Sequence, residues 1–432
     1  MVNIHRIIFT IPKTDTIWAA FARVNAVLTS LAFVFIYINV IGKSEAGSLY
    51  LWLGVVNIAA AIGGLGRAQF AYSVPANAFR SGEISIIANF IINSIVWVGA
   101  CTTLFTWLCM QFVPDALDDA PSMHIVLLSI LTAILTLLIE VLRILKRFGS
   151  AAMFNPGTCY FVLCIITLTL NRNLIEPKSM LLYLVIVHAC LVALALGTVW
   201  QTLGGWEKLT SYQLKILAID LPLPKYIWPY WLNTIPVVIL YQMDIVIVGL
   251  YFGPEMLAVY TMASRLAGGI SFVNSLAYAI LPSRISDLIS RDHSTYIGRE
   301  VRKFAIGLSF ISLFVILLLL IGIYFGLLKH VSSEALEGFI LLAFAHSVNC
   351  FLGARSVVLQ LTGNGHIQAS ISWIFASICC ILLLMAALYG NFLLVFMAVT
   401  ISIIGQALTE SWLLRWKLGI SSVPGIPDRT PA

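Results

Sequence analysis

Two charged residues stand near the middle of two long apolar segments that meet at a short turn. Asp244 lies ten residues before Pro254, and Arg265 lies eleven residues after it. If both segments are helices, each charge lies roughly 15 Å from the turn, because a helix rises about 1.5 Å per residue. A hairpin would then hold an acid and a base at one depth. Either they form a pair that locks two helices together, or both line a polar cavity for a charged cargo or a coupling cation.

Further charges lie nearer to the ends of the predicted helices, and most of them are Arg. The Arg fork suits phosphate and stays protonated when partly desolvated, so this pattern favours an anionic cargo such as a diphosphate-bearing lipid that enters from the cytoplasm. Arg23 and Arg355 could instead snorkel to the membrane interface, and Glu140 with Arg143 could be a local i,i+3 pair. The predicted substrate-binding residues are Arg265, Asp244, Arg23, Arg67, Glu140, Arg143 and Arg355.

The composition explains why these charges are conspicuous. The chain has 432 residues, of which 60% are hydrophobic and only 10% are charged. Soluble domains contain roughly 25% charged residues, so the sequence predicts a polytopic membrane protein. The net charge of +6 does not indicate nucleic-acid binding, because the basic residues are scattered over short loops.

The apolar runs predict about twelve transmembrane helices and an all-α fold with two six-helix lobes around a central cavity. The expected lobes are residues 1–203 and 228–415, joined by a cytoplasmic loop at 204–227 and followed by a cytoplasmic tail at 416–432. The runs lie at about 17–41, 47–66, 86–112, 123–143, 152–170, 180–203, 228–252, 256–281, 304–328, 335–361, 366–389 and 391–414.

The distribution of Lys and Arg predicts the orientation. Of the 25 basic residues, 18 fall in segments on the side of the termini, four in loops on the other side and three within helices. Basic residues accumulate in cytoplasmic loops. We therefore expect a multi-pass protein of the bacterial inner (plasma) membrane with both termini in the cytoplasm.

The sequence contains no motif for catalysis or ATP hydrolysis. It has no G-x-x-x-x-G-K-[ST], nucleophile elbow or zinc-helix motif. All eight cysteines lie in apolar runs without metal-ligand spacing to His. We expect a protein that is not an enzyme and that needs neither a cofactor nor a metal.

Several short motifs resemble those of the bacterial polysaccharide flippases of the O-antigen repeat-unit type, in the multidrug/oligosaccharidyl-lipid/polysaccharide exporter superfamily. In chain order they are I-G-K-S-E-A-G at Ile41–Gly47, E-V-L-R-I-L-K-R-F at Glu140–Phe148, D-x-x-x-x-G at Asp244–Gly249, F-G-P-E at Phe252–Glu255, Y-x-x-A-S-R-L at Tyr260–Leu266 and L-P-S-R-I-S at Leu281–Ser286.

This resemblance implies a flippase that moves an undecaprenyl-diphosphate-linked oligosaccharide from the cytoplasmic to the periplasmic leaflet by alternating access, for surface polysaccharide synthesis. Arg265 and Arg23 would bind the diphosphate or an acidic sugar. Membrane lipids, a polysaccharide polymerase and a chain-length regulator are the expected partners, and nucleic acid is not. The alternative is a multidrug/cation antiporter of the same superfamily. The predicted first helix has no internal acidic residue, and this argues against the alternative. A membrane-embedded glycan polymerase or ligase would need a long outer loop, and the predicted outer loops span roughly ten residues or fewer.

Overall fold

The structure of the protein is a computed structural model that describes residues 13–70, 84–112, 120–145, 147–203, 227–290, 295–325 and 331–423. The predicted inter-lobe loop at 204–227 lies outside the described residues except for Ile227, and so does the tail from residue 424 onward.

Within the described residues, each of the twelve predicted apolar runs is mostly helical. The first half contains α1 (Lys13–Ile41), α2 (Lys43–Gly63), α5 (Ile84–Phe112), α7 (Ser122–Ile144), α9 (Pro156–Thr169) and α10 (Pro177–Thr202), with short α3 (Arg67–Phe70), α8 (Phe148–Met153) and η2 (Arg172–Leu174) between them. The second half contains α12 (Trp228–Tyr251), α13 (Gly253–Ser290), α14 (Thr295–Tyr324), α15 (Ser333–Phe351), α16 (Arg355–Leu361), α17 (Gly365–Leu388) and α18 (Phe392–Leu418).

Ten of the helices are long and apolar enough to cross a membrane, or eleven if the bent pair α15 and α16 is one span, counted over the described residues. The remaining run lies within α13, which has 38 residues. α18 continues to Leu418, three residues beyond the predicted end of the second lobe. The prediction of an all-α polytopic membrane fold with about twelve helices is confirmed.

Local sequence sets several helix ends. Ser332 caps the start of α15, and its side chain accepts a hydrogen bond from the backbone N–H of Ala335 at 3.3 Å. Asn391 does the same for Leu393 at the start of α18 at 3.0 Å. The turn between α12 and α13 passes through Gly253 at φ 82°. This left-handed conformation favours glycine, so the hairpin predicted around this turn is built into the sequence.

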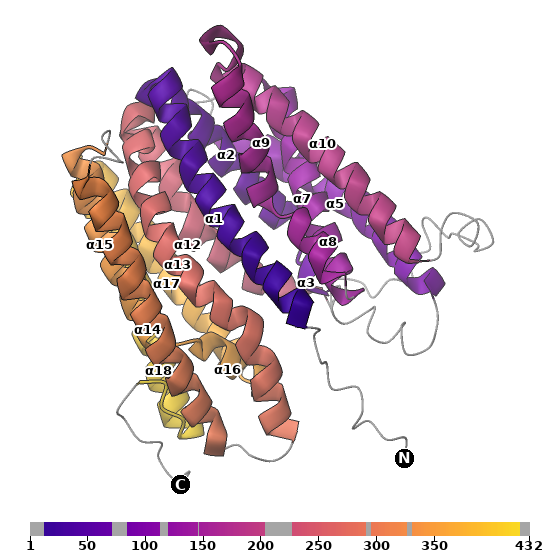
Figure 1. Cartoon of the computed structure of the whole chain (residues 1–432), viewed down its shortest axis with the longest axis vertical. Coiled ribbons are helices and arrows are strands. Elements are labelled where there is room, and N and C mark those ends of the chain that lie inside the picture. Colours follow the sequence, from indigo (N-terminus) through magenta and orange to yellow (C-terminus); the bar gives the residue numbers. More distant parts are fainter. Residues whose placement is uncertain are drawn as a thin grey trace.

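The two sets of helices lie side by side, and α2 runs along their junction (Figure 1). Its glycines allow close approach. A Cβ at Gly47 would lie 1.7 Å from the carbonyl oxygen of Pro254, and one at Gly54 would lie 2.9 Å from a methyl of Ile245. Small residues at such positions let helices in membranes pack backbone to backbone. α2 therefore joins the lobes through α12 and α13.

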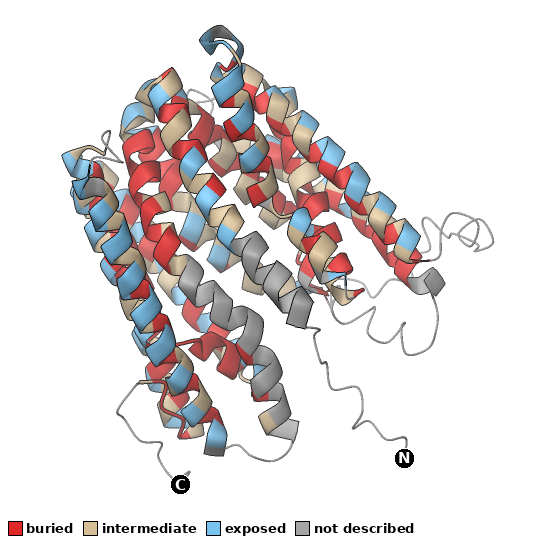
Figure 2. Ribbon diagram, viewed as in Figure 1, coloured by how far each residue is buried: buried red, intermediate tan, exposed pale blue. Residues whose placement is uncertain are grey.

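Exposed residues follow the outer faces of the helices, whereas buried residues gather between them (Figure 2). Many exposed side chains are large and apolar; on α14 they include Phe310, Leu313, Phe314 and Leu317. Patches of this size are rare on soluble monomers, and a hydrocarbon surrounding explains them. The protein is therefore a multi-pass membrane protein. α1 begins and α18 finishes at the same end of the bundle (Figure 1).

Candidate functional site

Asp244 lies on α12, and its side chain faces the interior of the second lobe. It is only 4% exposed. Its carboxylate accepts a short hydrogen bond from the hydroxyl of Tyr260 on α13 and another, at 2.8 Å, from the backbone N–H of Ile245. A buried carboxylate is stabilised by such donors. Asp244 thus fastens α12 to α13.

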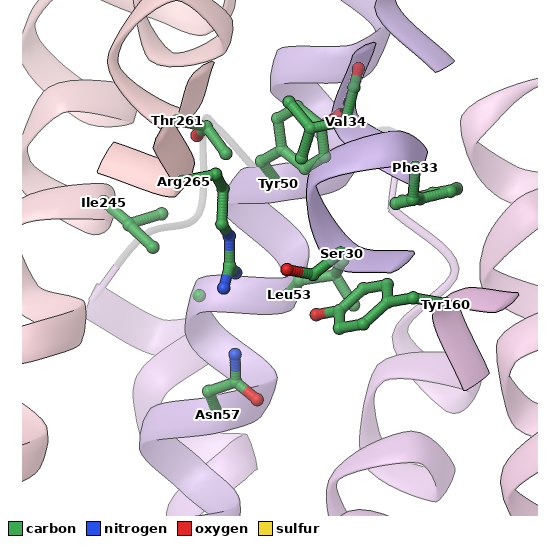
Figure 3. Close-up of a pocket in the computed structure, with 11 residues that line it drawn as sticks. Ser30, Phe33, Val34, Tyr50, Leu53, Asn57, Tyr160, Ile245, Thr261 and Arg265 are labelled. Carbon is green, nitrogen blue, oxygen red and sulfur yellow. Dashed lines mark hydrogen bonds between the residues drawn. The ribbon is translucent and has the colours of Figure 1, made fainter. Parts of the chain in front are cut away.

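Arg265 lies five residues beyond Tyr260 on α13, and its side chain points to the junction between the lobes. It borders a cavity of about 10 Å³, close to the space that one water molecule needs. The opposite walls come from the first lobe, where Ser30 on α1, Asn57 on α2 and Tyr160 on α9 present polar groups (Figure 3). Within the part of the chain that the structure describes, no carboxylate lies at ion-pair distance from Arg265.

The hypothesis of an ion pair between Asp244 and Arg265 is therefore wrong for this state of the protein. Tyr260 occupies the position next to the carboxylate that the hypothesis gave to Arg265. Arg265 borders the junction cavity and Asp244 does not, so the two charges do not share one cavity in this state. The two side chains lie at similar depths but contact different groups. What each one contacts depends on how its helix is rotated about its own axis, and depth does not fix that rotation.

Of the other predicted residues of the first lobe, Arg67, Glu140 and Arg143 do not line this junction cavity. Arg67, at the start of α3, donates a hydrogen bond at 3.1 Å to Ser94 on α5 and is 7% exposed. Glu140 and Arg143 form an i,i+3 pair on α7 with 2.5 Å between Oε1 and Nη1. Arg23 lies within α1, but its side chain lies outside the described residues.

Arg355, the last predicted site residue, begins α16 and is deeply buried. Its Nε lies 3.2 Å from Oε2 of Glu410 on α18, and the two side chains are 4% and 2% exposed. Nε forms no hydrogen bond along this contact. The guanidinium also donates to the carbonyl oxygens of Gly353 at 2.9 Å and Asn349 at 3.2 Å, and to Oδ1 of Asn349 at 2.5 Å. Arg355 does not snorkel, because its partners lie inside the lobe.

This ion pair borders a second, larger cavity of about 320 Å³ within the second lobe. Amide and hydroxyl groups continue from Glu410 along α18 and α17. Gln406 donates to Oε1 of Glu410 at 3.0 Å and to Oγ of Ser372 at 3.2 Å. Gln368 also donates to Ser372 at 3.2 Å and accepts from Gln360 at 3.2 Å. We call the cavity lined by these residues the lobe cavity.

The sequence contained a signal for this polar network that the prediction did not use. Gln368 and Ser372 are four residues apart on α17, and Gln406 and Glu410 are four residues apart on α18. Residues at this spacing share one face of a helix, so two polar faces in two apolar helices indicated a common polar site. Nothing comparable in the sequence links Ser30, Asn57 or Tyr160 with Arg265.

Comparisons with known proteins identify the fold. No protein-family model matches the sequence, and no curated protein matches it. A crystal structure of a mutant of the Vibrio cholerae MATE transporter VcmN aligns with 94% of this chain and 98% of its own, with a TM-score of 0.62 and 16% sequence identity. An outward-facing multidrug resistance MATE family transporter of the MOP superfamily aligns with 94% of this chain and 96% of its own, with a TM-score of 0.54 and 14% identity.

A third structure, a MOP superfamily transporter from Pyrococcus furiosus, aligns with 94% of this chain and 96% of its own at a TM-score of 0.51 and 13% identity. The protein therefore has the fold of MATE transporters, with two lobes of six helices. The polarity of the binding pocket in the P. furiosus transporter is described as reversed, suggesting a different function. Pocket charge thus differs between proteins of this fold, and the function of this chain must be argued from its own residues.

Proposed function

We propose that the protein is a secondary transporter that moves a lipid-linked anionic cargo across the membrane by alternating access of its two lobes. The cargo is an undecaprenyl-diphosphate-linked oligosaccharide, translocated from the cytoplasmic to the periplasmic leaflet of a bacterial inner membrane for surface polysaccharide synthesis. The observation that carries this proposal is the position of Arg265, a cation without an acidic partner among the described residues, at the junction of the lobes.

The chemistry around Arg265 supports an anionic cargo. An isolated cation within the membrane is costly and marks a functional site by default. A planar guanidinium can bind two phosphate oxygens at once. Ser30, Asn57 and Tyr160 across the junction add neutral hydrogen-bonding groups that could share the same phosphates or the first sugar.

The size of the junction cavity supports alternating access. About 10 Å³ cannot hold a diphosphate, so cargo can reach Arg265 only if the lobes separate. The contacts between the lobes along α2 include a hydrogen bond from Asn57 to Gln242 at 3.4 Å and one from Nε1 of Trp231 to the carbonyl oxygen of Ile62 at 2.8 Å. Together with the close contacts at Gly47 and Gly54, these hydrogen bonds would have to break and reform when the lobes separate.

A multidrug/cation antiporter is the second candidate, because proteins of similar structure include multidrug resistance transporters. In addition, the second lobe buries two carboxylates, Asp244 and Glu410. Against this candidate, both carboxylates have partners in Tyr260 and Arg355, whereas Arg265 has no acidic partner among the residues that the structure describes.

A deletion strain distinguishes the two candidates. If the protein is a flippase, the strain loses surface polysaccharide and accumulates undecaprenyl-linked units on the cytoplasmic leaflet. If it is a drug antiporter, the strain keeps its polysaccharide and becomes sensitive to cationic dyes. Labelling of single cysteines from the periplasm in the same host tests the proposed orientation, with both termini in the cytoplasm.

A further inference from the structure

The lobe cavity is separate from the junction cavity at Arg265 and has the size of a small-molecule site. Its walls come from α12, α13, α15, α16, α17 and α18, all in the second half of the chain. Its 320 Å³ lies at the lower end of the range of about 300–1,000 Å³ found for ligand pockets. At about 30 Å³ per molecule of liquid water, it is far larger than a hydration site needs.

The charge of the lobe cavity is balanced. Arg355 and Glu410 neutralise each other at 3.2 Å, and each has further hydrogen-bonding partners. The other polar side chains at the wall are amides and hydroxyls. They are Ser271, Asn349, Ser356, Gln360, Gln368, Ser372 and Gln406. An ion of either sign would gain little from such a wall, whereas a neutral ligand with many hydrogen-bonding groups would match it.

The amides also keep unused hydrogen-bonding capacity toward the cavity. The amide nitrogen of Gln406 donates twice, but its carbonyl oxygen accepts from no described residue. The same holds for the carbonyl oxygen of Gln360, whose nitrogen donates to Gln368. An amide can form about four hydrogen bonds, so both residues retain acceptors for a ligand that donates hydroxyl groups.

Part of the wall is apolar. Pro236, Val237 and Leu240 on α12 also line the cavity, together with the ring of Tyr241. A sugar ring has the same division, with hydroxyl groups around its edge and C–H groups on its faces. We propose that the lobe cavity binds one neutral sugar ring. This inference rests on the proposed function and deepens it, because it assigns a second site to the glycan end of the cargo.

Saturation-transfer NMR on the purified full-length protein tests this proposal. The probes are free D-glucose, D-galactose and N-acetyl-D-glucosamine, and the detergent must lack a sugar head group, as lauryldimethylamine oxide does. Transfer to at least one of the three is expected. Gln406→Leu removes one of the amides at the wall, and the loss of one hydrogen bond weakens binding about fivefold.

Gln201→Leu is the matched control, because it makes the same chemical change at an exposed position near the end of α10. It should bind as the unaltered protein does. Gln360→Leu provides a second variant if Gln406→Leu does not fold, because Gln360 is exposed to the cavity and is not needed to satisfy a buried charge.

Absence of transfer to all three sugars would overturn the proposal, and so would equal transfer in the cavity variants and the control. Displacement of the sugar by tetraphenylphosphonium would also overturn it, since it would make the lobe cavity a cation site. The assay requires no transport. If the protein binds a sugar but its deletion strain exports polysaccharide normally, the sugar site stands and the proposed flippase function is wrong.

Discussion

The ion pair between Arg355 and Glu410 gives the sharpest energetic prediction. Replacing Arg355 with Met removes the charge that compensates Glu410, whose side chain is 2% exposed and which, among the described residues, accepts a hydrogen bond from the amide of Gln406. Removing one partner of a buried pair costs about 3–5 kcal/mol, because the other charge stays buried and uncompensated. We expect Arg355→Met to lower the free energy of unfolding by at least that amount, because it also removes the hydrogen bonds from Arg355 to Asn349 and Gly353.

The double variant should be less harmful than this single one. Arg355→Met with Glu410→Met removes both charges and keeps side chains of similar length, a replacement that is often close to neutral. What remains is the loss of the donors to Asn349 and Gly353, at about 1 kcal/mol per hydrogen bond. Glu410→Met alone should fall between the two, because Arg355 then keeps three carbonyl acceptors.

Equilibrium unfolding in mixed micelles with increasing fractions of sodium dodecyl sulfate, followed by circular dichroism, measures these differences. Lys303→Met is the control, because Lys303 forms an exposed i,i+3 pair with Glu300 at 2.8 Å, and such pairs contribute less than about 1 kcal/mol. The reasoning is refuted if Arg355→Met is no worse than Lys303→Met, or if the double variant is as unstable as Arg355→Met.

Three further predictions concern residues on α2 and α13. Arg265→Ala should abolish export while the protein still inserts, and Arg265→Lys should retain part of the export, because Lys keeps the charge without the planar fork of Arg. The amount of surface polysaccharide in a complemented deletion strain measures export. Full export by the alanine variant would contradict this prediction. Tyr260→Phe removes the hydroxyl that donates to Asp244 and should cost about 1–3 kcal/mol in the same unfolding assay, whereas no change would mean that another donor replaces it. Gly47→Ala places a methyl group 1.7 Å from the carbonyl oxygen of Pro254, so α2 and α13 must separate at this point. We therefore expect faster hydrogen exchange of the backbone amides at the start of α2. Unaltered exchange would show that the contact is not tight.

The number and positions of the helices could be predicted from the sequence, because whether a segment enters a bilayer depends on its own length and hydropathy. The turn between α12 and α13 could also be predicted, since Gly253 and Pro254 mark it locally. The break between α15 and α16 was missed within the single predicted run 335–361. There the chain bends by 45° and passes through Gly353 at φ 73°, a local feature that a hydropathy count does not register.

The partners of the charges were decided by the tertiary structure alone. The sequence placed Asp244 and Arg265 at similar depths, but depth does not fix how a helix is rotated. In the folded protein Asp244 faces Tyr260, and Arg265 faces α1, α2 and α9 of the other lobe. From its position in the sequence, Arg355 could reach the membrane interface. In the structure it lies against Glu410, which is 55 residues away in the sequence. Hydropathy and spacing act along one chain segment, whereas a buried charge takes its partner from whichever helix packing brings beside it.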